Sequence, residues 1–245
     1  MKRYREEIDR IDRTILELLI ERSEYAKKIG EVKKRKGLQI HVPERERQII
    51  EKLLELNKGR FPEKALVRIF REIISACLSL EQPLKVGYLG PVATFTHQAA
   101  LEHFGISAKY IPLSTIKDVF EEVERGNIDY GVVPVENTIE GVVNYTRFLV
   151  IGKRELGRSG KDKTSLLFAV KDEAGALYKA LEPFYKHNVN LTKIESRPSK
   201  EKSWDYVFFV DLEGHIEDEN VKRALEELKN RTKLVRVLGS YPIAI

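Results

Sequence analysis

A heptad pattern at the start of this 245-residue chain constrains the fold more than any other feature of the sequence. Apolar residues recur with alternating spacings of four and three residues, and the pattern continues through Arg22. Its apolar positions are Tyr4, Ile8, Ile11, Ile15, Leu18, Tyr25, Ile29 and Val32. We expect one helix that ends before Gly37 and is about 50 Å long, since each residue adds about 1.5 Å. A domain of this size cannot bury such a helix alone, so the pattern predicts a homodimer or higher homo-oligomer whose long helices pack together.

Two shorter helices are predicted to complete an all-α domain over residues 1–82. Proline is favoured at the first position of a helix, and Pro43 and Pro62 open these two segments. The apolar stripe of the first contains Ile49, Ile50, Leu53 and Leu54, and that of the second, which should run to about Glu81, contains Leu66, Ile69, Phe70, Ile73, Ile74 and Cys77.

Four charged residues lie on these apolar faces. Arg22 takes a heptad position, and Lys33 follows eleven residues later, about three turns on and on nearly the same face. Glu46 and Glu81 extend the stripes of the two shorter helices. Each alone can reach water at a helix end or through a flexible side chain. Four together would need partners, and two cations with two carboxyls around one interior suit a small dicarboxylate that carries a hydroxyl.

Beyond Pro83 the pattern changes to short apolar runs that alternate with helices, which indicates an α/β segment over residues 83–152. Strands are expected at Lys85–Leu89, Ala108–Ile111, Tyr130–Val135 and Phe148–Ile151, and helices at His97–Phe104 and Thr115–Arg125. We expect Ser114 to cap the second helix and Gly126 to end it. The polar residues from Glu136 to Gly141 should form a loop between two strands, either as part of a site or as an ordinary solvated turn.

The remaining segment, residues 153–245, has the element order βαββαβ, which is that of the ferredoxin-like α+β fold. Its strands are expected at Thr164–Val170, Asn190–Arg197, Asp205–Asp211 and Leu234–Leu238, and its helices at Ala174–His187 and Asp218–Asn230. Gly175 either eases the start of a helix or opens an amino-acid site, and Glu195 with Arg197 is either a surface pair or part of that site.

Composition limits the environment and the partners. The single cysteine, Cys77, excludes an internal disulfide and a multi-cysteine zinc site and favours a reducing cytosol. We expect a cytoplasmic protein, because the start of the chain has no apolar signal region and no apolar run reaches membrane length. The net charge of +5 comes from interleaved acidic and basic residues, which favours small anionic substrates over nucleic acid.

Residues 1–82 resemble the all-helical chorismate mutase family over their whole length. The resemblance implies carboxylate ligands at Arg22 and at Arg5, the latter in the partner subunit's site. It further implies an Arg-Glu pair at Arg45 and Glu46, and ligands of the substrate's ether oxygen at Lys33 and Glu81. Val42 and Cys77 stand where some members have aspartate and serine. The implied reaction, chorismate to prephenate, needs no cofactor, nucleophile or metal, only orientation and stabilisation of the charge that develops on the ether oxygen.

Residues 83–152 resemble one lobe of prephenate dehydratase, whose fold is periplasmic-binding-protein-like. The similar motifs run from Tyr88 to Pro91, Thr94 to Thr96, Val135 to Gly141 and Thr146 to Phe148. The resemblance implies that Thr146 helps the prephenate hydroxyl to leave, while Thr94, Thr96, Glu136, Asn137 and Arg147 bind the substrate. In the family a second lobe separates the last two motifs, whereas here residues 142–145 join them directly. We therefore expect the dehydratase activity to be absent or severely reduced.

Residues 153–245 resemble an ACT regulatory domain. Gly175, Ala176 and Leu177, and then Glu195, Ser196, Arg197 and Pro198, match the family's phenylalanine-binding motifs. Together the three segments resemble the bifunctional chorismate mutase/prephenate dehydratases of L-phenylalanine biosynthesis, with feedback by phenylalanine. The alternative is a non-catalytic phenylalanine-sensing dimer whose helices are only a scaffold. A scaffold would be better served by apolar residues at Arg22 and Glu46.

Overall fold

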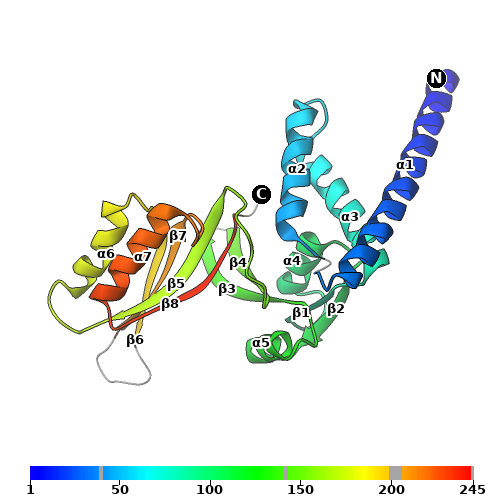
Figure 1. Ribbon diagram of the computed structural model, residues 1–245. Helices are drawn as coiled ribbons and strands as arrows, with labels where there is room; N and C mark the ends of the chain where they lie inside the picture. The colour runs from blue at the N-terminus through cyan, green and yellow to red at the C-terminus, as the bar shows by residue number, and fades with distance from the viewer. Residues whose placement is uncertain (39–40, 141–142, 199–205, 244–245) are drawn as a thin grey trace. The chain divides into compact units, whose positions relative to one another are not determined.

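The computed structural model describes residues 1–38, 41–140, 143–198 and 206–243, except for the side chains of residues 137–140 and 143–145. Residues Met1–Arg154 and Glu155–Ile245 form two compact units, which Figure 1 shows as ribbons. The first unit contains three helices followed by a four-stranded sheet, and the second contains another four-stranded sheet with two helices. This arrangement confirms the predicted fold classes in their predicted order.

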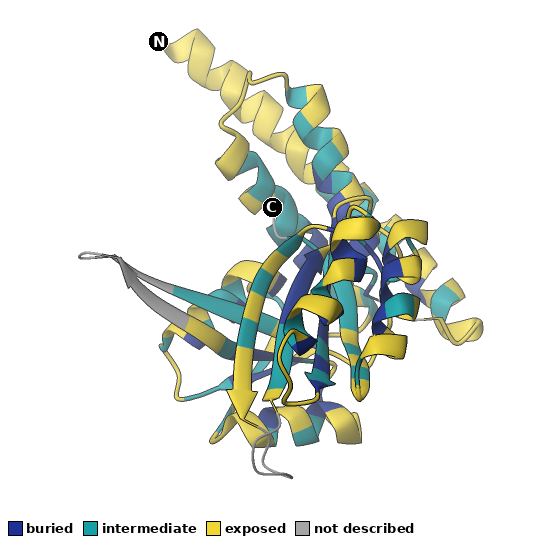
Figure 2. Ribbon diagram, turned by 90° about the vertical axis from the view of Figure 1, so that its left-hand side faces the viewer, coloured by how far each residue is buried: buried dark blue, intermediate teal, exposed yellow. Residues whose placement is uncertain are grey.

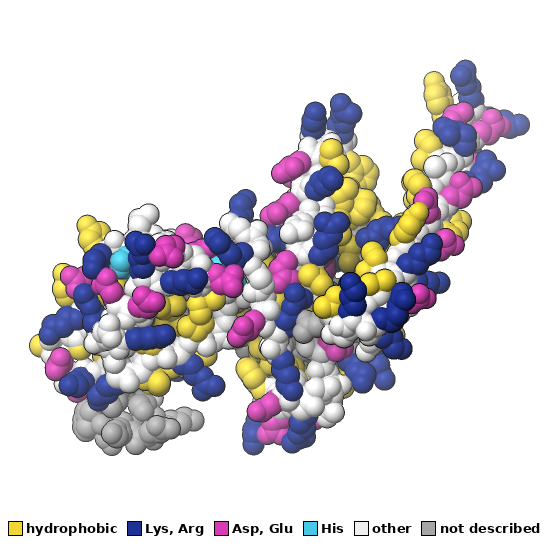
Figure 3. Space-filling view, viewed as in Figure 1, with side chains coloured by type: hydrophobic (Ala, Val, Ile, Leu, Met, Phe, Trp, Pro, Cys, Tyr) yellow, Lys and Arg dark blue, Asp and Glu magenta, His cyan; other side chains and the backbone are white. Residues whose placement is uncertain are grey.

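The first three helices of the first unit are α1 (Lys2–Arg35), α2 (Pro43–Asn57) and α3 (Glu63–Glu81). Pro43 begins α2, as the sequence predicts, whereas Pro62 is the N-cap of α3 and stands one residue before the helix. The C-terminal half of α1 packs on α3, where Gly30 lies against Glu81. The rest of α1 is exposed (Figure 2), and Figure 3 shows apolar side chains along the face of α1 that looks toward α2 and α3.

The sheet of the first unit has the strand order β2-β1-β3-β4. Its strands are β1 (Lys85–Leu89), β2 (Lys109–Leu113), β3 (Tyr130–Glu140) and β4 (Val143–Ile151), and its helices are α4 (Phe95–Phe104) and α5 (Ile116–Arg125). β1 pairs in parallel with β2 and β3, whereas β4 runs antiparallel to β3. Val86, Tyr88, Ala100, Phe104 and Val132 form the buried core between this sheet and α4.

The C-terminal end of α4 docks the sheet onto α3. Gly105 ends α4 with a φ of 74°, and a Cβ added there would stand 2.5 Å from Cβ of Ser75. The backbone N–H of Ile106 donates to Oε2 of Glu72 at 3.0 Å. A left-handed glycine without a side chain therefore allows the close approach of the two elements.

One local prediction for the sheet is wrong. The polar residues from Glu136 to Glu140 lie in β3 and pair with β4, so the two strands form one long hairpin instead of two strands and a polar loop. The register shifts between Pro134 and Glu136. An antiparallel partner supplies hydrogen bonds to the backbone whatever the side chains are, so polar residues can continue a strand. Gly141 lies outside the described residues.

The predicted cap of α5 is also wrong by one residue. Oγ1 of Thr115, not of Ser114, accepts the N–H of Asp118 at 3.0 Å, and the carboxylate of Asp118 accepts the N–H of Thr115 at 3.0 Å. Such a capping box requires an acceptor three residues after the cap. From Ser114 that position is Lys117, which has no acceptor in its side chain.

The second unit is an antiparallel sheet in the order β6-β7-β5-β8 with both helices on one face (Figure 1). Its elements are β5 (Asp162–Val170), α6 (Ala176–Lys186), β6 (Leu191–Pro198), β7 (Tyr206–Glu213), α7 (Glu219–Arg231) and β8 (Leu234–Pro242). Every second residue of β5 is buried, and Leu166 and Phe168 join Phe184 of α6 and Leu228 of α7 in the core. The predicted ferredoxin-like order is confirmed.

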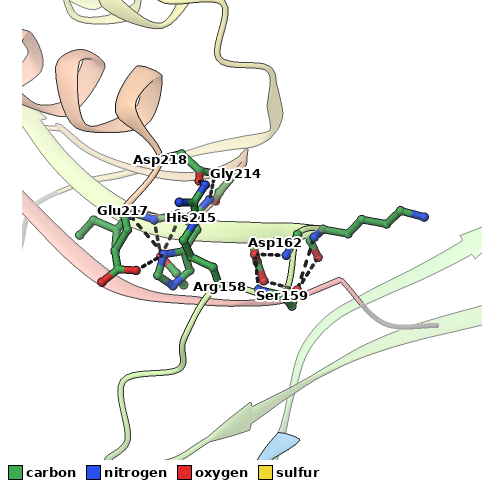
Figure 4. A network of polar contacts seen from close by, with 12 residues as sticks. Arg158, Ser159, Asp162, Gly214, His215, Glu217 and Asp218 are labelled. Atoms are coloured by element: carbon green, nitrogen blue, oxygen red, sulfur yellow. Dashed lines mark hydrogen bonds and ion pairs between the residues drawn. The ribbon is translucent and has the colours of Figure 1, made fainter. Parts of the chain in front are cut away.

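A polar network in the second unit attaches the segment before β5 to the loop between β7 and α7 (Figure 4). The carboxylate of Asp162 accepts the backbone N–H of Ser159 at 2.9 Å. Nδ1 of the buried His215 accepts the N–H of Glu217 at 3.2 Å, so Nε2 carries the proton and donates to the carbonyl of Leu156 at 2.9 Å. Both ring nitrogens are thus used in holding the fold.

Candidate active site

Two of the predicted mutase residues meet between α1 and α3. Nζ of Lys33 lies 3.6 Å from Oε2 of Glu81, with 20% of the lysine side chain and 5% of the glutamate side chain exposed. Nearby on the same two helices, Nη1 of Arg22 donates to Sγ of Cys77 at 2.9 Å. The helical period that placed these residues on apolar faces therefore brings two cations and one carboxyl into a partly buried region.

Gly30 makes room for the Glu81 side chain. A Cβ at Gly30 would stand 2.8 Å from Cγ of Glu81 and 3.0 Å from its Cβ, so a larger residue would displace the carboxyl. Burial raises the pKa of Glu81, while the charge and hydrogen bond of Lys33 act in the opposite direction. Because the effect of burial is the larger one, the carboxyl stays protonated to higher pH than an ordinary glutamate does, and a protonated carboxyl can donate a hydrogen bond.

Glu46 lies in a different polar environment. Its Oε2 lies 3.5 Å from Nε2 of His41, and its Oε1 lies 3.7 Å from Nε of Arg71. Arg45 is exposed beside it. Arg5 is exposed near the start of α1 and stands about 25 Å along the helix from Arg22, at about 1.5 Å per residue. Within one chain, Arg5 is therefore remote from Arg22.

His41 and Arg71 were not singled out in the sequence. His41 stands between two helices in a segment without periodicity, and Arg71 is one of several charged residues in α3. Both become prominent only through tertiary contacts with the sheet segment. The sequence offers one weak signal for His41, its position two residues before the predicted start of a helix at Pro43.

The predicted dehydratase residues lie at one edge of the sheet and on the hairpin. Thr94 caps α4: its Oγ1 accepts the N–H of His97 at 3.3 Å and donates to the carbonyl of Pro91 at 3.1 Å. Thr96 is buried. Because β1 and β3 are parallel, the loop after β1 lies at the same edge of the sheet as the residues that follow Pro134 in β3.

The hairpin brings the other three residues into adjacent register positions. Thr146 pairs with Asn137, and Arg147 pairs with Glu136, whose Oε2 lies 3.8 Å from Nη1 of Arg147. The side chain of Asn137 lies outside the described part of the structure. The two motifs that are close in the sequence are thus also adjacent in space, on two strands of one sheet.

The predicted effector residues occupy two places in the second unit. Gly175 is the N-cap of α6 in the left-handed conformation, with φ 80°, followed by the buried Ala176 and by Leu177, which packs against the core. On β6, Glu195 accepts from Arg197 at 2.7 Å and pairs with Lys193 at 3.3 Å, and these side chains are largely on the surface. Ser196 and Pro198 are exposed on the same strand.

Within the described ranges, no group of three or more His, Cys, Asp or Glu side chains is arranged to hold a metal ion. No helix in that part of the chain has the length and apolar character needed to cross a membrane.

Three family models match the chain in order. They are chorismate mutase type II over residues 4–82, prephenate dehydratase over residues 86–156 and the ACT domain over residues 164–230. The sequence is 49% identical to a bifunctional chorismate mutase/prephenate dehydratase of Aquifex aeolicus (strain VF5), with 100% of this chain and 98% of the relative covered. It is 32% identical to the protein of the same name from Neisseria gonorrhoeae, with 99% and 97% covered.

The alignment with the Aquifex protein runs over 356 positions, whereas this chain has 245 residues. The relative therefore contains residues that have no counterpart here.

Solved structures match a smaller part of the chain. The prephenate dehydratase of Streptococcus mutans is 36% identical with a TM-score of 0.56, and the match covers 64% of this chain and 97% of that one. GqqA, described as a novel type of quorum quenching acylase, is 25% identical with a TM-score of 0.60, and the match covers 65% and 95%.

Proposed function

Because the chain belongs to the family of bifunctional chorismate mutase/prephenate dehydratases, we propose that Arg22, Lys33, Glu46 and Glu81 form a site that rearranges chorismate to prephenate. The observation that carries this proposal is the Lys33–Glu81 pair, a mostly buried carboxyl of raised pKa beside a partly buried ammonium. A scaffold helix pair gains little from burying such a pair, since the cost of removing two charged groups from water offsets much of their attraction.

The role proposed for each residue follows from the charges of the substrate and from the charge that develops on its ether oxygen during the reaction. The rearrangement breaks the ether C–O bond and forms a C–C bond within one molecule, so no group is transferred to the protein. Arg22 would bind a substrate carboxylate and hold the reactive conformer. Lys33 and the protonated Glu81 would donate to the ether oxygen, where negative charge increases in the transition state.

The test is a steady-state assay of the purified chain with chorismate. Arg22→Ala should lower kcat/KM by roughly a hundredfold or more, because a charge-assisted contact is worth roughly 1.5–3 kcal/mol and orientation adds to it. Arg13→Ala is the control, since Arg13 is an exposed arginine of α1 whose Nε donates within its own helix, to the carbonyl of Asp9. Near-normal activity of Arg22→Ala would remove the assignment.

We also propose that the dehydratase step is absent or severely reduced in this chain. Decarboxylation with loss of hydroxide needs a substrate that is surrounded and shielded from water. The residues expected to bind prephenate lie on one four-stranded sheet and on the loop and helix that follow its first strand. The proposal is supported by the pairing of β3 with β4, because Glu136 and Thr146 lie on the two strands of one hairpin.

The same assay tests this proposal by following phenylpyruvate formed from prephenate at neutral pH. We expect no more than the spontaneous background, with no change in Thr146→Ala. Turnover on the order of 1 per second or faster, abolished by Thr146→Ala, would show that one lobe is sufficient and would contradict the proposal.

A third proposal is that L-phenylalanine binds the ACT domain through residues 175–177 and 195–198 and regulates the enzyme. Millimolar phenylalanine should raise the midpoint of thermal unfolding, because a ligand that binds the folded state stabilises it by mass action. L-lysine at the same concentration is the control. No heat in calorimetry and no shift with phenylalanine would exclude this role.

The alternative, a non-catalytic phenylalanine-sensing dimer, is separated by the same two measurements. It would show the phenylalanine-dependent shift without any turnover of chorismate. The charges at Arg22 and Lys33 on otherwise apolar faces favour the enzyme.

A further inference from the structure

Each oxygen of the Glu46 carboxylate faces a residue of the helical part. Oε2 lies 3.5 Å from Nε2 of His41, and Oε1 lies 3.7 Å from Nε of Arg71. Glu46 stands in the first turn of α2 with 20% of its side chain exposed, whereas 7% of the His41 side chain is exposed. A glutamate side chain has several accessible rotamers, so these two contacts decide where its carboxylate points.

Both of the holding residues are themselves attached to the sheet segment. Tyr130, the first residue of β3, places its hydroxyl 3.0 Å from Nδ1 of His41, and the two rings meet edge to face at 5.2 Å. Arg154 donates to the carbonyl of His41 at 3.0 Å. Arg71 donates from Nη1 to the carbonyl of Glu102 in α4 at 3.1 Å. Each carboxylate oxygen is therefore linked to the sheet segment through one intermediate residue.

We propose that the α/β segment of residues 83–154 positions Glu46 for the mutase reaction, with His41 and Arg71 as positioning residues and Tyr130 as the anchor of His41. The inference rests on the proposed function, in which Glu46 belongs to the mutase site. It assigns the α/β segment of residues 83–154 a positioning role in the mutase reaction, and this role does not require dehydratase turnover.

Hydrogen bonding assigns the protons along this path. Burial raises the pKa of Tyr130 to about 12, so the hydroxyl keeps its proton at neutral pH. A carboxylate oxygen only accepts, so Nε2 of His41 is the nitrogen that donates toward Glu46, and in that tautomer Nδ1 accepts from the Tyr130 hydroxyl. A neutral imidazole that accepts at Nδ1 carries its own proton on Nε2, which faces Oε2 of Glu46. In both hydrogen bonds of this path, from Tyr130 to His41 and from His41 to Glu46, the donor therefore lies on the Tyr130 side and the acceptor on the Glu46 side.

The size of the effect follows from how strongly such a reaction depends on orientation. A displacement of about 1 Å in a positioned group can cost on the order of a hundredfold in rate. Tyr130→Phe removes one hydroxyl and leaves Arg71 in place, so we expect kcat of the mutase reaction to fall about tenfold. KM should change less than about twofold, because Arg22 is untouched.

The experiment compares Tyr130→Phe with Tyr110→Phe in the full chain. Tyr110 is a second tyrosine of the same sheet, but its hydroxyl donates to the carbonyls of Ala100 and Gly105 within the α/β segment. Both variants lose one hydroxyl and should lose similar stability, whereas only Tyr130→Phe should lose mutase activity per folded molecule. His41→Gln, which restores a donor near the position of Nε2, should recover part of the activity that His41→Ala loses.

A double-mutant cycle separates positioning from general destabilisation. In the Glu46→Ala background Tyr130→Phe should have no further effect, whereas a merely structural tyrosine would lower the activity by the same factor in both backgrounds. Equal factors, or normal kcat in Tyr130→Phe, would overturn the inference while leaving the proposed function intact. Normal activity of Glu46→Ala would instead contradict the assignment of Glu46 in the proposed function.

Discussion

The proposed role of Glu81 at the ether oxygen depends on whether its carboxyl is protonated. Its pKa is raised by burial, so the folded protein binds this proton more tightly than the unfolded chain does. Mutase activity that needs the protonated form is therefore highest at low pH and falls as the pH rises through the folded-state pKa. The same ionisation makes the folded state less stable as the pH rises.

Glu81→Gln tests this role, because an amide donates a hydrogen bond at every pH. The variant should keep mutase activity and lose the decline at higher pH, measured as kcat/KM against pH. Glu51→Gln serves as the control, since Glu51 is a more exposed glutamate that pairs with Arg47 within α2. An unchanged pH profile in Glu81→Gln would refute the donor role.

The sequence predicted individual residues where a regular period places them. Arg22, Lys33 and Glu81 stood out because they interrupt apolar faces, and the structure brings Lys33 and Glu81 together. His41 and Arg71 could not be found in this way. Their importance arises from contacts between segments that are distant in the sequence, such as His41 with Tyr130, and periodicity carries no information about such contacts.

Helix ends were predictable because they depend on local chemistry. Pro43 and Gly126 mark their boundaries as expected, since proline and left-handed glycine act within a few residues. The hairpin of β3 and β4 was mispredicted because the polar character of residues 136–140 suggested a loop. Pairing with an antiparallel strand is a non-local interaction, and here it outweighs the low strand propensity of Glu136, Asn137 and Glu140.

The capping box of α5 gives a prediction at this scale with a matched control. Thr115→Ala should destabilise the Met1–Arg154 unit by about 1 kcal/mol, because the N–H of Asp118 loses its acceptor. Ser114→Ala should leave stability nearly unchanged. Urea unfolding of both variants measures the difference. Equal losses, or a larger loss for Ser114→Ala, would contradict the cap that the structure places at Thr115.

Several large apolar side chains of the described helices are uncovered within a single copy. Along α1, Ile8, Ile15 and Leu18 have exposed fractions of 55%, 50% and 58%. Leu56 at the end of α2 and Phe61 before α3 are also exposed. Contiguous apolar surface of this kind marks an interface in a soluble protein. The heptad pattern favours α1 of a second copy as the partner, so we expect a dimer in solution.

A dimer of this kind would also explain Arg5. Since Arg5 is remote from Arg22 in its own chain, it can bind the same substrate only in the partner subunit's site. Arg5→Ala and Arg22→Ala should each be nearly inactive alone. In a dimer formed from one copy of each variant, one of the two sites would contain both arginines.

Complementation measures this directly. When the two variants are unfolded, mixed in equal amounts and refolded together, random pairing makes half of the dimers mixed, and we expect about a quarter of the unmutated mutase activity. Light scattering should give the mass of two chains for each variant and for the mixture. If Arg5 acted in its own chain, every site in the mixture would lack one arginine and no activity would return. Recovered activity would thus require both a dimer and a shared site, whereas a dimer without recovery would place Arg5 outside the partner subunit's site.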